Sequence, residues 1–242
     1  MEKLYKHIEN FKVKTYHADY RRRISPNSVL GYMEEVATNH ARKLGYSYQA
    51  SKEKGFFWIL RSSKYEFKRV PMLDEIVTVS TWPAGIHGLK ALRRFEFKVD
   101  QEIVGKGYHY WLMATLDKMK PFVHKGFADK MLELPITDED FFRLNKVRIP
   151  EEMLYSYDRI IMANDLDWNN HVNNVKYASI VFNAIPKEIL DKSDILSFHI
   201  DYLKECRHND VLKIYYKVVE DEIYVEGRID KTSMFKSLTK IG

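Results

Sequence analysis

The chain is poor in cysteine, glycine and proline, and it lacks any long apolar run. Cys206 is its single cysteine, so an intrachain disulfide is excluded, and this suits a reducing compartment. No apolar stretch approaches the roughly 20 residues that a membrane-spanning helix needs. Residues 1–10 are charged where a signal peptide would be apolar. These absences predict a cytoplasmic protein with no membrane partner.

The composition that remains is typical of a folded protein rich in β-sheet. Hydrophobic residues make up 45% and charged residues 30% of the chain, which allows a sizeable core and excludes a disordered protein. The 16 Tyr and 13 Phe favour extensive sheet. The net charge of +5 suits an acidic partner, and an acidic carrier protein, the phosphates of CoA and nucleic acid all fit on charge alone.

The hydrophobic pattern follows the same order in two halves of the chain. In each half a short strand precedes an apolar helix, and further strands follow it. Ser25 and Asn27 are candidate caps of the first helix, and Gly45 is its stop signal. The expected strands are 10–16, 57–69, 75–82, 90–99 and 102–116, then 156–162, 196–204, 210–219, 222–229 and a weaker one at the end; the expected helices are 29–44 and 174–185.

This order predicts a duplication with three parts. We expect an N-terminal repeat at 1–117, which supplies a substrate pocket but no catalytic cluster, a linker at 118–152, and a catalytic C-terminal repeat at 153–242. A shift of 146 residues places Asp19 on Asp165 near the start of each repeat, and a shift of 135 places Asp74 on Asn209 farther along.

A dense polar cluster precedes the second helix. Asp167, Asn169 and His171 are spaced by two, so an extended stretch would point all three side chains the same way. A helix-capping turn is the simplest structural explanation. A calcium loop is excluded because Lys176 stands where the bidentate carboxylate belongs. Zinc is disfavoured because Cys206 is the only thiol and no second histidine has helix spacing.

The first repeat serves as an internal control for this cluster. With the 146-residue shift, its counterparts are Arg21, Arg23 and Ser25, so it keeps a candidate cap but lacks the other polar groups. Glu205 similarly corresponds to the apolar Val70 under the 135-residue shift, and a partner such as His171 would explain an acid there. Both differences favour a functional site in the second repeat.

Cys206 offers an alternative in which a thiol and a histidine perform nucleophilic catalysis. Its counterpart in the first repeat is Pro71, and on a regular strand Cys206 would face away from Glu205. We therefore rank the cysteine below Glu205 as a functional residue.

These residues resemble the acyl-acyl carrier protein (acyl-ACP) thioesterases. Residues 167–177 read Asp-Trp-Asn-Asn-His-Val-Asn-Asn-Val-Lys-Tyr, and residues 202–206 read Tyr-Leu-Lys-Glu-Cys, similar to the two stretches that mark this family. Residues 81–89 and 108–117 are also similar to it, so the likeness covers nearly the whole chain. The departures are Trp168 and Asn170 in the first stretch, and Leu203-Lys204 where paired arginines are frequent.

The resemblance implies an α+β tandem, or double, hotdog fold, in which two antiparallel sheets each wrap around a central helix. It implies a hydrolase that releases free fatty acid from fatty acyl-ACP and ends chain elongation. It also implies that Asp167, Asn169, His171 and Glu205 are the active-site residues. No cofactor and no metal are expected. Because no transit peptide precedes residue 1, we expect a bacterial or mature form.

We propose from the sequence that Glu205 and His171 activate water, Asn169 holds the water or the carbonyl, and Asp167 positions the cluster. Asp167 as base or transient nucleophile stays open. Backbone N–H groups at 172–174 are expected to face the carbonyl oxygen.

The expected partner is an acyl carrier protein that carries a fatty acyl-phosphopantetheine. No nucleic acid is expected, because the chain has no helix-turn-helix. An acyl-CoA thioesterase of the same fold is the nearest alternative. A hotdog dehydratase ranks lower, and a non-enzymatic acyl-binding regulator would not need the four polar residues together. The sequence leaves the monomer and the homodimer open.

Overall fold

A computed structural model describes residues 5–132 and 145–242. The first half contains β1 (His7–Lys12), η1 (Thr15–His17), α2 (Pro26–Lys43), α3 (Tyr48–Glu53), β2 (Phe56–Phe67), β3 (Ile76–His87), β4 (Lys90–Val99), β5 (Glu102–Thr115), β6 (Pro121–Phe122) and α4 (Lys125–Leu132). The second half contains β7 (Leu154–Ile160), η3 (Ala163–Asp165), α5 (Lys176–Asn183), α6 (Lys187–Lys192), β8 (Ile195–Tyr202), β9 (Val211–Val219), β10 (Glu222–Ile229) and β11 (Thr232–Ile241).

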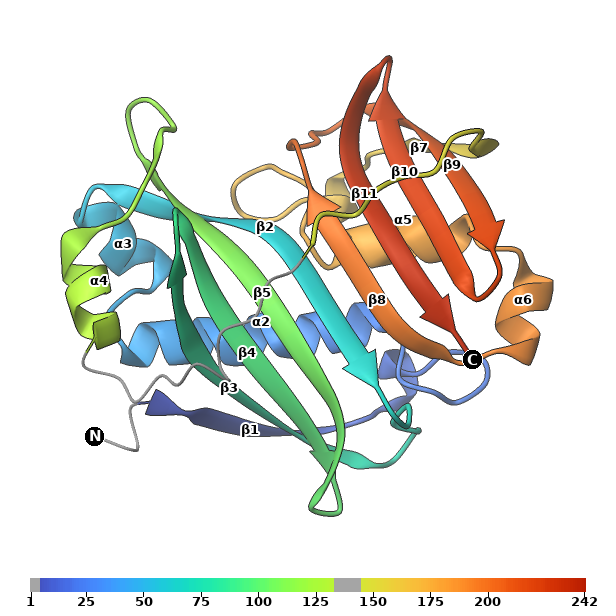
Figure 1. Ribbon diagram of the computed structural model, residues 1–242, viewed down its shortest axis with the longest axis horizontal. Coiled ribbons are helices and arrows are strands. Elements are labelled where there is room, and N and C mark those ends of the chain that lie inside the picture. Colours follow the sequence, from blue (N-terminus) through green and yellow to red (C-terminus); the bar gives the residue numbers. More distant parts are fainter. Residues whose placement is uncertain (1–4, 133–144) are drawn as a thin grey trace.

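The strands form one antiparallel sheet with the order β1-β3-β4-β5-β2-β8-β11-β10-β9-β7, and β6 pairs with β5. Each half repeats the same internal order, and the equivalent strands β2 and β8 pair where the halves meet, from Ser62 opposite Asp201 to Glu66 opposite Ser197. The long helix α2 and the shorter α5 lie behind this sheet (Figure 1). The double hotdog fold is confirmed, with the two expected sheets joined edge to edge into one.

Helix α2 forms where its cap and its apolar face predict it. The Ser25 side chain accepts a hydrogen bond from the backbone N–H of Ser28, and Pro26 occupies the first turn. Asn27 does not cap the helix, because its side-chain amide donates to Val175 O (3.3 Å) and Ser179 Oγ (2.6 Å). This amide therefore ties the start of α2 to α5 across the junction between the halves.

The expected linker at 118–152 is wrong in its first part. Strand β6 and helix α4 lie within it and belong to the first half. Phe127 and Met131 of α4 are buried against Leu44, Tyr46 and Phe56, because the apolar face of an eight-residue helix needs a core to cover it. Residues 133–144 of the expected linker lie outside the described residues.

The hydrogen bonds of the two halves reveal the register of the duplication. The N–H of Asp74 donates to Val13 O (2.8 Å), and the N–H of Asn209 donates to Ile161 O (2.9 Å). This equivalence confirms the 135-residue shift, but it requires a shift of 148, not 146, for the residues before each helix. The isolated bridges Ala18–Ile24 and Leu166–Val172 follow the same 148-residue shift.

In the described part of the chain, no helix has the length and apolarity to cross a bilayer.

Candidate active site

A tight turn gathers the polar side chains at positions 167, 169 and 171. The N–H of Asp167 donates to His171 O (2.8 Å), and Asp167 Oδ1 accepts from the N–H groups of Asn169 (2.8 Å) and His171 (3.3 Å). Asn170 takes the left-handed conformation, with φ at +60°, which asparagine tolerates better than most residues. The expected extended stretch is therefore wrong, since the turn makes the side chains converge.

A second segment brings the carboxyl group of Glu205 to this turn. Glu205 follows the end of β8, and the N–H of Val172 donates to Cys206 O (2.9 Å), which fixes the two segments side by side. His171 Nε2 lies 3.1 Å from Glu205 Oε2. The His171 side chain is 29% exposed and that of Glu205 is 43% exposed, so water reaches the pair.

An ion pair between Arg159 and the buried Asp165 stabilises the chain where it enters the turn. Asp165 is 6% exposed and accepts two bonds from Arg159 Nη2, at 2.6 and 2.7 Å, and one from the N–H of Met162 (2.8 Å). Its backbone oxygen accepts from the N–H of Asn173 (2.8 Å). Asp165 therefore stabilises the turn and is not one of its candidate reactive groups.

The first half contains the same turn with different side chains. With the 148-residue shift, Asp167 corresponds to Asp19, whose Oδ1 accepts from the N–H groups of Arg21 and Arg23, both at 2.9 Å. Arg22 has φ at +65°, as Asn170 has +60°. The earlier matching of Asp167 to Arg21 is therefore wrong by two residues, and the aspartate is common to both turns.

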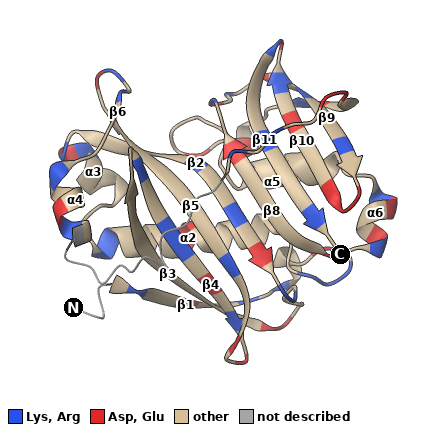
Figure 2. Ribbon diagram, viewed as in Figure 1, with Lys and Arg blue, Asp and Glu red and all other residues tan. Residues whose placement is uncertain are grey.

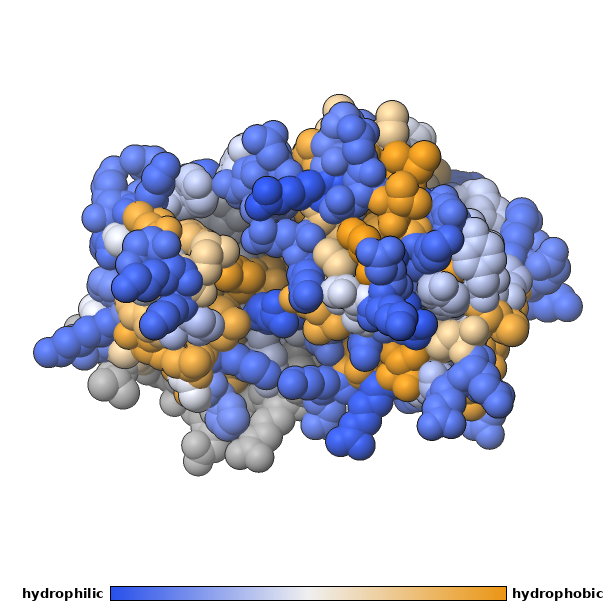
Figure 3. Space-filling model, turned by 90° about the horizontal axis from the view of Figure 1, so that it is seen from above, coloured by the Kyte–Doolittle hydropathy of each residue, from blue (hydrophilic) through white to orange (hydrophobic). Residues whose placement is uncertain are grey.

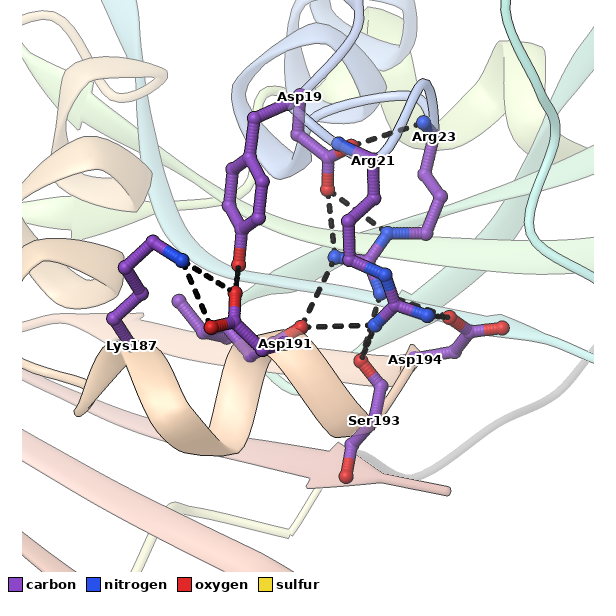
Figure 4. Close-up of polar contacts among 9 residues, drawn as sticks. Asp19, Arg21, Arg23, Lys187, Asp191, Ser193 and Asp194 are labelled. Carbon is purple, nitrogen blue, oxygen red and sulfur yellow. Dashed lines mark hydrogen bonds and ion pairs between the residues drawn. The ribbon is translucent and has the colours of Figure 1, made fainter.

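The 148-residue shift shows which side chains differ between the turns of the two halves. Asn169 and His171 correspond to Arg21 and Arg23, which in the first half bind the end of α6 and the residues that follow it (Figure 4). Glu205 still corresponds to Val70. The amide, the imidazole and the second carboxylate are thus the groups that distinguish the second half.

A cavity of about 860 Å³ opens at these residues and extends between the halves. All four predicted site residues line it, as do one face of α2, parts of β2 and β4, and Trp111 of β5. Seen from above, hydrophobic surface shows between hydrophilic side chains (Figure 3). The apolar part of the wall includes Ala37, Ala41, Leu44, Phe57, Leu60, Ala91, Leu92, Trp111 and Phe127. This volume suits an extended apolar ligand whose polar end meets the turn.

Two lining residues were missed by the sequence analysis. Glu34 on α2 lines the cavity from the half without a catalytic cluster, and burial together with the negative charge of Asp167 raises its pKa to about 7. Trp168, 76% exposed, has its ring centre 5.7 Å from that of Tyr48 of α3, with the two rings tilted by 47°. Only the position of Glu34 in the predicted helix, on the same face as Ala37 and Ala41, could have signalled its role.

Two of the three backbone N–H groups at 172–174, which were expected to face the carbonyl oxygen, already donate to backbone oxygens. The N–H of Val172 donates to Cys206 O, and that of Asn173 donates to Asp165 O. The side-chain oxygen of Asn173 also accepts from the N–H of Val175 (2.9 Å). Asn169 and Asn174 line the cavity, and their side-chain amides are the better candidates for contact with a carbonyl oxygen.

Cys206 is buried with no exposed surface, and burial raises the pKa of its thiol to about 11. A thiol in this state is a poor nucleophile at neutral pH. We expect Cys206→Ser to keep kcat close to that of the wild type, because the serine hydroxyl can occupy the place of the thiol beside Tyr177. Mass spectrometry of the wild type during turnover is the second measurement; an acyl group trapped on Cys206 would contradict this prediction.

The geometry defines a double hotdog protein in which the His171–Glu205 pair lines a cavity between the halves. Residues 4–127 match the model of the acyl-ACP thioesterase N-terminal domain, and residues 157–236 match that of the C-terminal domain. The chain belongs to the acyl-ACP thioesterase family.

Related proteins agree with this assignment. The chain is 26% identical over 223 residues to the chloroplastic oleoyl-acyl carrier protein thioesterase of Coriandrum sativum, covering 84% of this chain and 60% of the relative. It is also 26% identical over 223 residues to the chloroplastic dodecanoyl-[acyl-carrier-protein] hydrolase of Umbellularia californica, covering 84% of this chain and 57% of the relative. The chain thus spans about three-fifths of the length of these curated relatives.

Solved structures show the same fold. A crystal structure of an acyl-ACP thioesterase from Bacteroides thetaiotaomicron superimposes with a TM-score of 0.86 at 21% identity, covering 98% of each chain. The 12:0-ACP thioesterase from Umbellularia californica has a TM-score of 0.82 at 20% identity and covers 98% of this chain and 97% of that one.

Proposed function

We propose that this protein hydrolyses the thioester bond of fatty acyl-ACP and releases a free fatty acid. The observation that carries the proposal is the His171–Glu205 pair, which lies at the polar end of a large cavity with apolar walls. An acyl chain can lie in that cavity while its thioester carbonyl meets the turn at 167–171. Family membership supports the same reaction.

The reaction begins with a water molecule next to His171 and Glu205. One of these two groups takes a proton from the water as its oxygen attacks the carbonyl carbon, and the other orients the pair through their 3.1 Å contact. The tetrahedral intermediate then collapses, the carbon–sulfur bond breaks, and the proton passes to the departing thiolate. The products are a carboxylic acid and the free thiol of the carrier.

Asp167 and Asn169 serve this step in different ways. Asp167 Oδ1 is already bonded to two backbone N–H groups, and Asp19 makes the same bonds in the half without a catalytic cluster. This supports a positioning role for Asp167 and disfavours it as a nucleophile. The amide of Asn169 can donate to the developing oxyanion, since it lines the cavity beside His171.

The carrier is assigned from the charges at the cavity. Lys204 and Arg207 line its polar end, and the Arg207 side chain is 70% exposed. Arg21 and Arg23 are bonded to a backbone oxygen of the second half, and Arg93 lies in the cavity wall. Lysine and arginine are otherwise interspersed with acids over both halves (Figure 2). We therefore assign carrier recruitment to Lys204 and Arg207.

This assignment predicts a salt effect that depends on the substrate. For acyl-ACP, kcat/KM should fall as salt rises while kcat changes little, because attraction between surface charges is screened over about 8 Å at physiological ionic strength. The Lys204→Ala/Arg207→Ala variant should flatten this dependence. Lys192→Ala, which removes an exposed charge on α6, should not. An acyl-pantetheine substrate, which has no carrier, should give a nearly flat series, and equal salt sensitivity for both substrates would contradict the assignment.

The direct test is a turnover assay that compares acyl-ACP with the matching acyl-CoA. We expect kcat/KM to be higher for acyl-ACP at each chain length. A preference for acyl-CoA would change the carrier but keep the chemistry. Acyl binding without turnover of either substrate would indicate a binding protein and contradict the proposal. A cytoplasmic location stays a prediction, to be tested by fractionation, and light scattering distinguishes the monomer from the homodimer.

A further inference from the structure

Glu34 lies in the middle of α2, in the half whose own turn lacks the amide and the imidazole. It shares one helix face with Ala37, Thr38 and Ala41, and all four line the cavity. Asp167, Asn169, His171 and Glu205 line the same cavity from the second half. Glu34 is therefore a carboxyl group that the first half contributes to the space where the proposed reaction occurs.

No partner within the described residues balances this carboxyl group. No hydrogen-bond donor and no cation of the described ranges lies within bonding distance of it. The three arginines that line the cavity are bound elsewhere: Arg61 donates to Leu203 O (3.0 Å), Arg93 donates to His40 Nδ1 (3.0 Å) and Thr81 Oγ1 (3.2 Å), and Arg207 lies 4.0 Å from Glu205 Oε2. The charged and titratable groups that act on Glu34 are Asp167 from the turn, Glu35 from its own helix and Tyr202 from β8.

An acid in these surroundings keeps its proton. Burial and the charges of Asp167 and Glu35 raise the pKa of Glu34 to about 7, so below that pH the group is a neutral carboxylic acid. A neutral carboxylic acid has one O–H donor. The oxygen that could receive it is Asp167 Oδ2, whose contact with Asn169 Nδ2 is long at 3.5 Å, whereas Oδ1 serves both backbone N–H groups of the turn.

We propose that Glu34 is a positioning residue that acts as a neutral acid and donates a hydrogen bond to the carboxylate of Asp167. Through this bond the first half holds the turn at 167–171 in its reactive form. The inference deepens the proposed thioesterase function and rests on it. It also gives the half without a catalytic cluster a role in the chemistry besides enclosing the acyl chain.

The sign of the pH effect follows from the raised pKa of Glu34. As the pH rises through about 7, Glu34 loses its proton, the donor disappears, and a second negative charge faces Asp167. Wild-type kcat should therefore fall on the alkaline side. Glu34→Gln keeps a neutral donor at every pH, so it should match the wild-type kcat at pH 6 and lose the alkaline decline.

Two further variants separate positioning from simple packing. Glu34→Ala should lower kcat about tenfold or more at pH 6, because the hydrogen bond to the charged carboxylate of Asp167 is absent. Glu35→Gln is the matched control, since Glu35 is exposed and bonds Asn39 on the same helix. It should keep the wild-type kcat at pH 6 and an alkaline decline, which starts at slightly lower pH because the charge of Glu35 no longer raises the pKa of Glu34. A Glu34→Gln variant as slow as Glu34→Ala, or one that keeps the alkaline decline, would overturn the inference.

A titration that needs no turnover completes the experiment. Carbon-13 NMR of glutamate-labelled protein, with the Glu34→Gln spectrum for assignment, follows the Glu34 carboxyl directly. We expect its midpoint near pH 7, and a lower midpoint in the Asp167→Asn variant. A Glu34 that titrates near its ordinary pKa of 4.5 overturns the inference with or without turnover. A wild type that titrates as expected but hydrolyses no thioester refutes the proposed function alone.

Discussion

Replacing His171 by alanine is expected to lower kcat for acyl-ACP by about 10²–10⁴-fold, the usual cost of losing a general acid–base group. The imidazole contacts Glu205 and also lines the cavity at the turn. KM should change little, because the acyl chain is held by the apolar walls far from the imidazole. Steady-state kinetics with a single acyl-ACP measures both quantities.

Two variants serve as controls for this result. His208→Ala removes an exposed histidine two residues after Cys206, outside the cavity lining, and should leave kcat unchanged. Glu205→Gln keeps the size of the side chain and an acceptor for the imidazole but removes the carboxylate. If His171 and Glu205 act as a unit, the double variant should be hardly slower than either single variant. A His171→Ala enzyme within a few-fold of wild type would remove the imidazole from the mechanism.

The fold was predictable because its signals are local and repeated. Ser25 caps α2 as the sequence indicated, and Asp100 and Gln101 take positive φ values in the tight turn between β4 and β5. The alternation of polar and apolar residues located the long strands to within a few residues. The pairing of β2 with β8, which joins the halves edge to edge, could not be predicted from the sequence. Pairing between strands far apart in the chain produces no local sequence pattern.

The structure places the four predicted site residues on one cavity, but the sequence did not predict the geometry that brings them together. Asp167, Asn169, His171 and Glu205 were marked by their chemistry, whereas the turn that makes them converge depends on backbone bonds and on the left-handed Asn170. The two-residue error in the repeat hid the equivalence of Asp167 and Asp19. Glu34 was missed because a glutamate on a helix is ordinarily solvated, and the sequence does not show its burial or the nearby charge of Asp167.

The 148-residue shift also explains the role of Arg21 and Arg23 in the first half. Arg23 is 4% exposed, and it donates to Asp19 Oδ2 (2.9 Å), Ser193 O (2.7 Å) and Asp194 Oδ1 (2.8 Å). Figure 4 shows how it points from the first half's turn to the chain after α6, beside Arg21. The position that holds the proposed catalytic imidazole in one half thus holds an anchor between the halves in the other.

We therefore expect Arg23→Met to destabilise the protein by about 3 kcal/mol, the lower end of the cost of breaking a buried ion pair. Methionine keeps most of the apolar stem but leaves Asp19 Oδ2 without its side-chain donor, whereas the oxygen of Ser193 keeps its bond from Arg21. Asp194 is 44% exposed and regains water, so the higher values are not expected. For a chain of this size the loss corresponds to a fall in Tm of about 6–12 °C.

Urea unfolding at pH 7, followed by the fluorescence of the four tryptophans, measures this loss of stability. Arg22→Met is the matched control, because Arg22 lies in the same turn and is exposed. Its left-handed φ is equally unfavourable for arginine and methionine. It should change the free energy of unfolding by less than about 0.5 kcal/mol. Arg21→Met should fall between the two, since Arg21 donates to Leu190 O and Ser193 O but is partly exposed. Equal losses for Arg22→Met and Arg23→Met would show that the turn, and not the anchor between the halves, sets the stability of this junction.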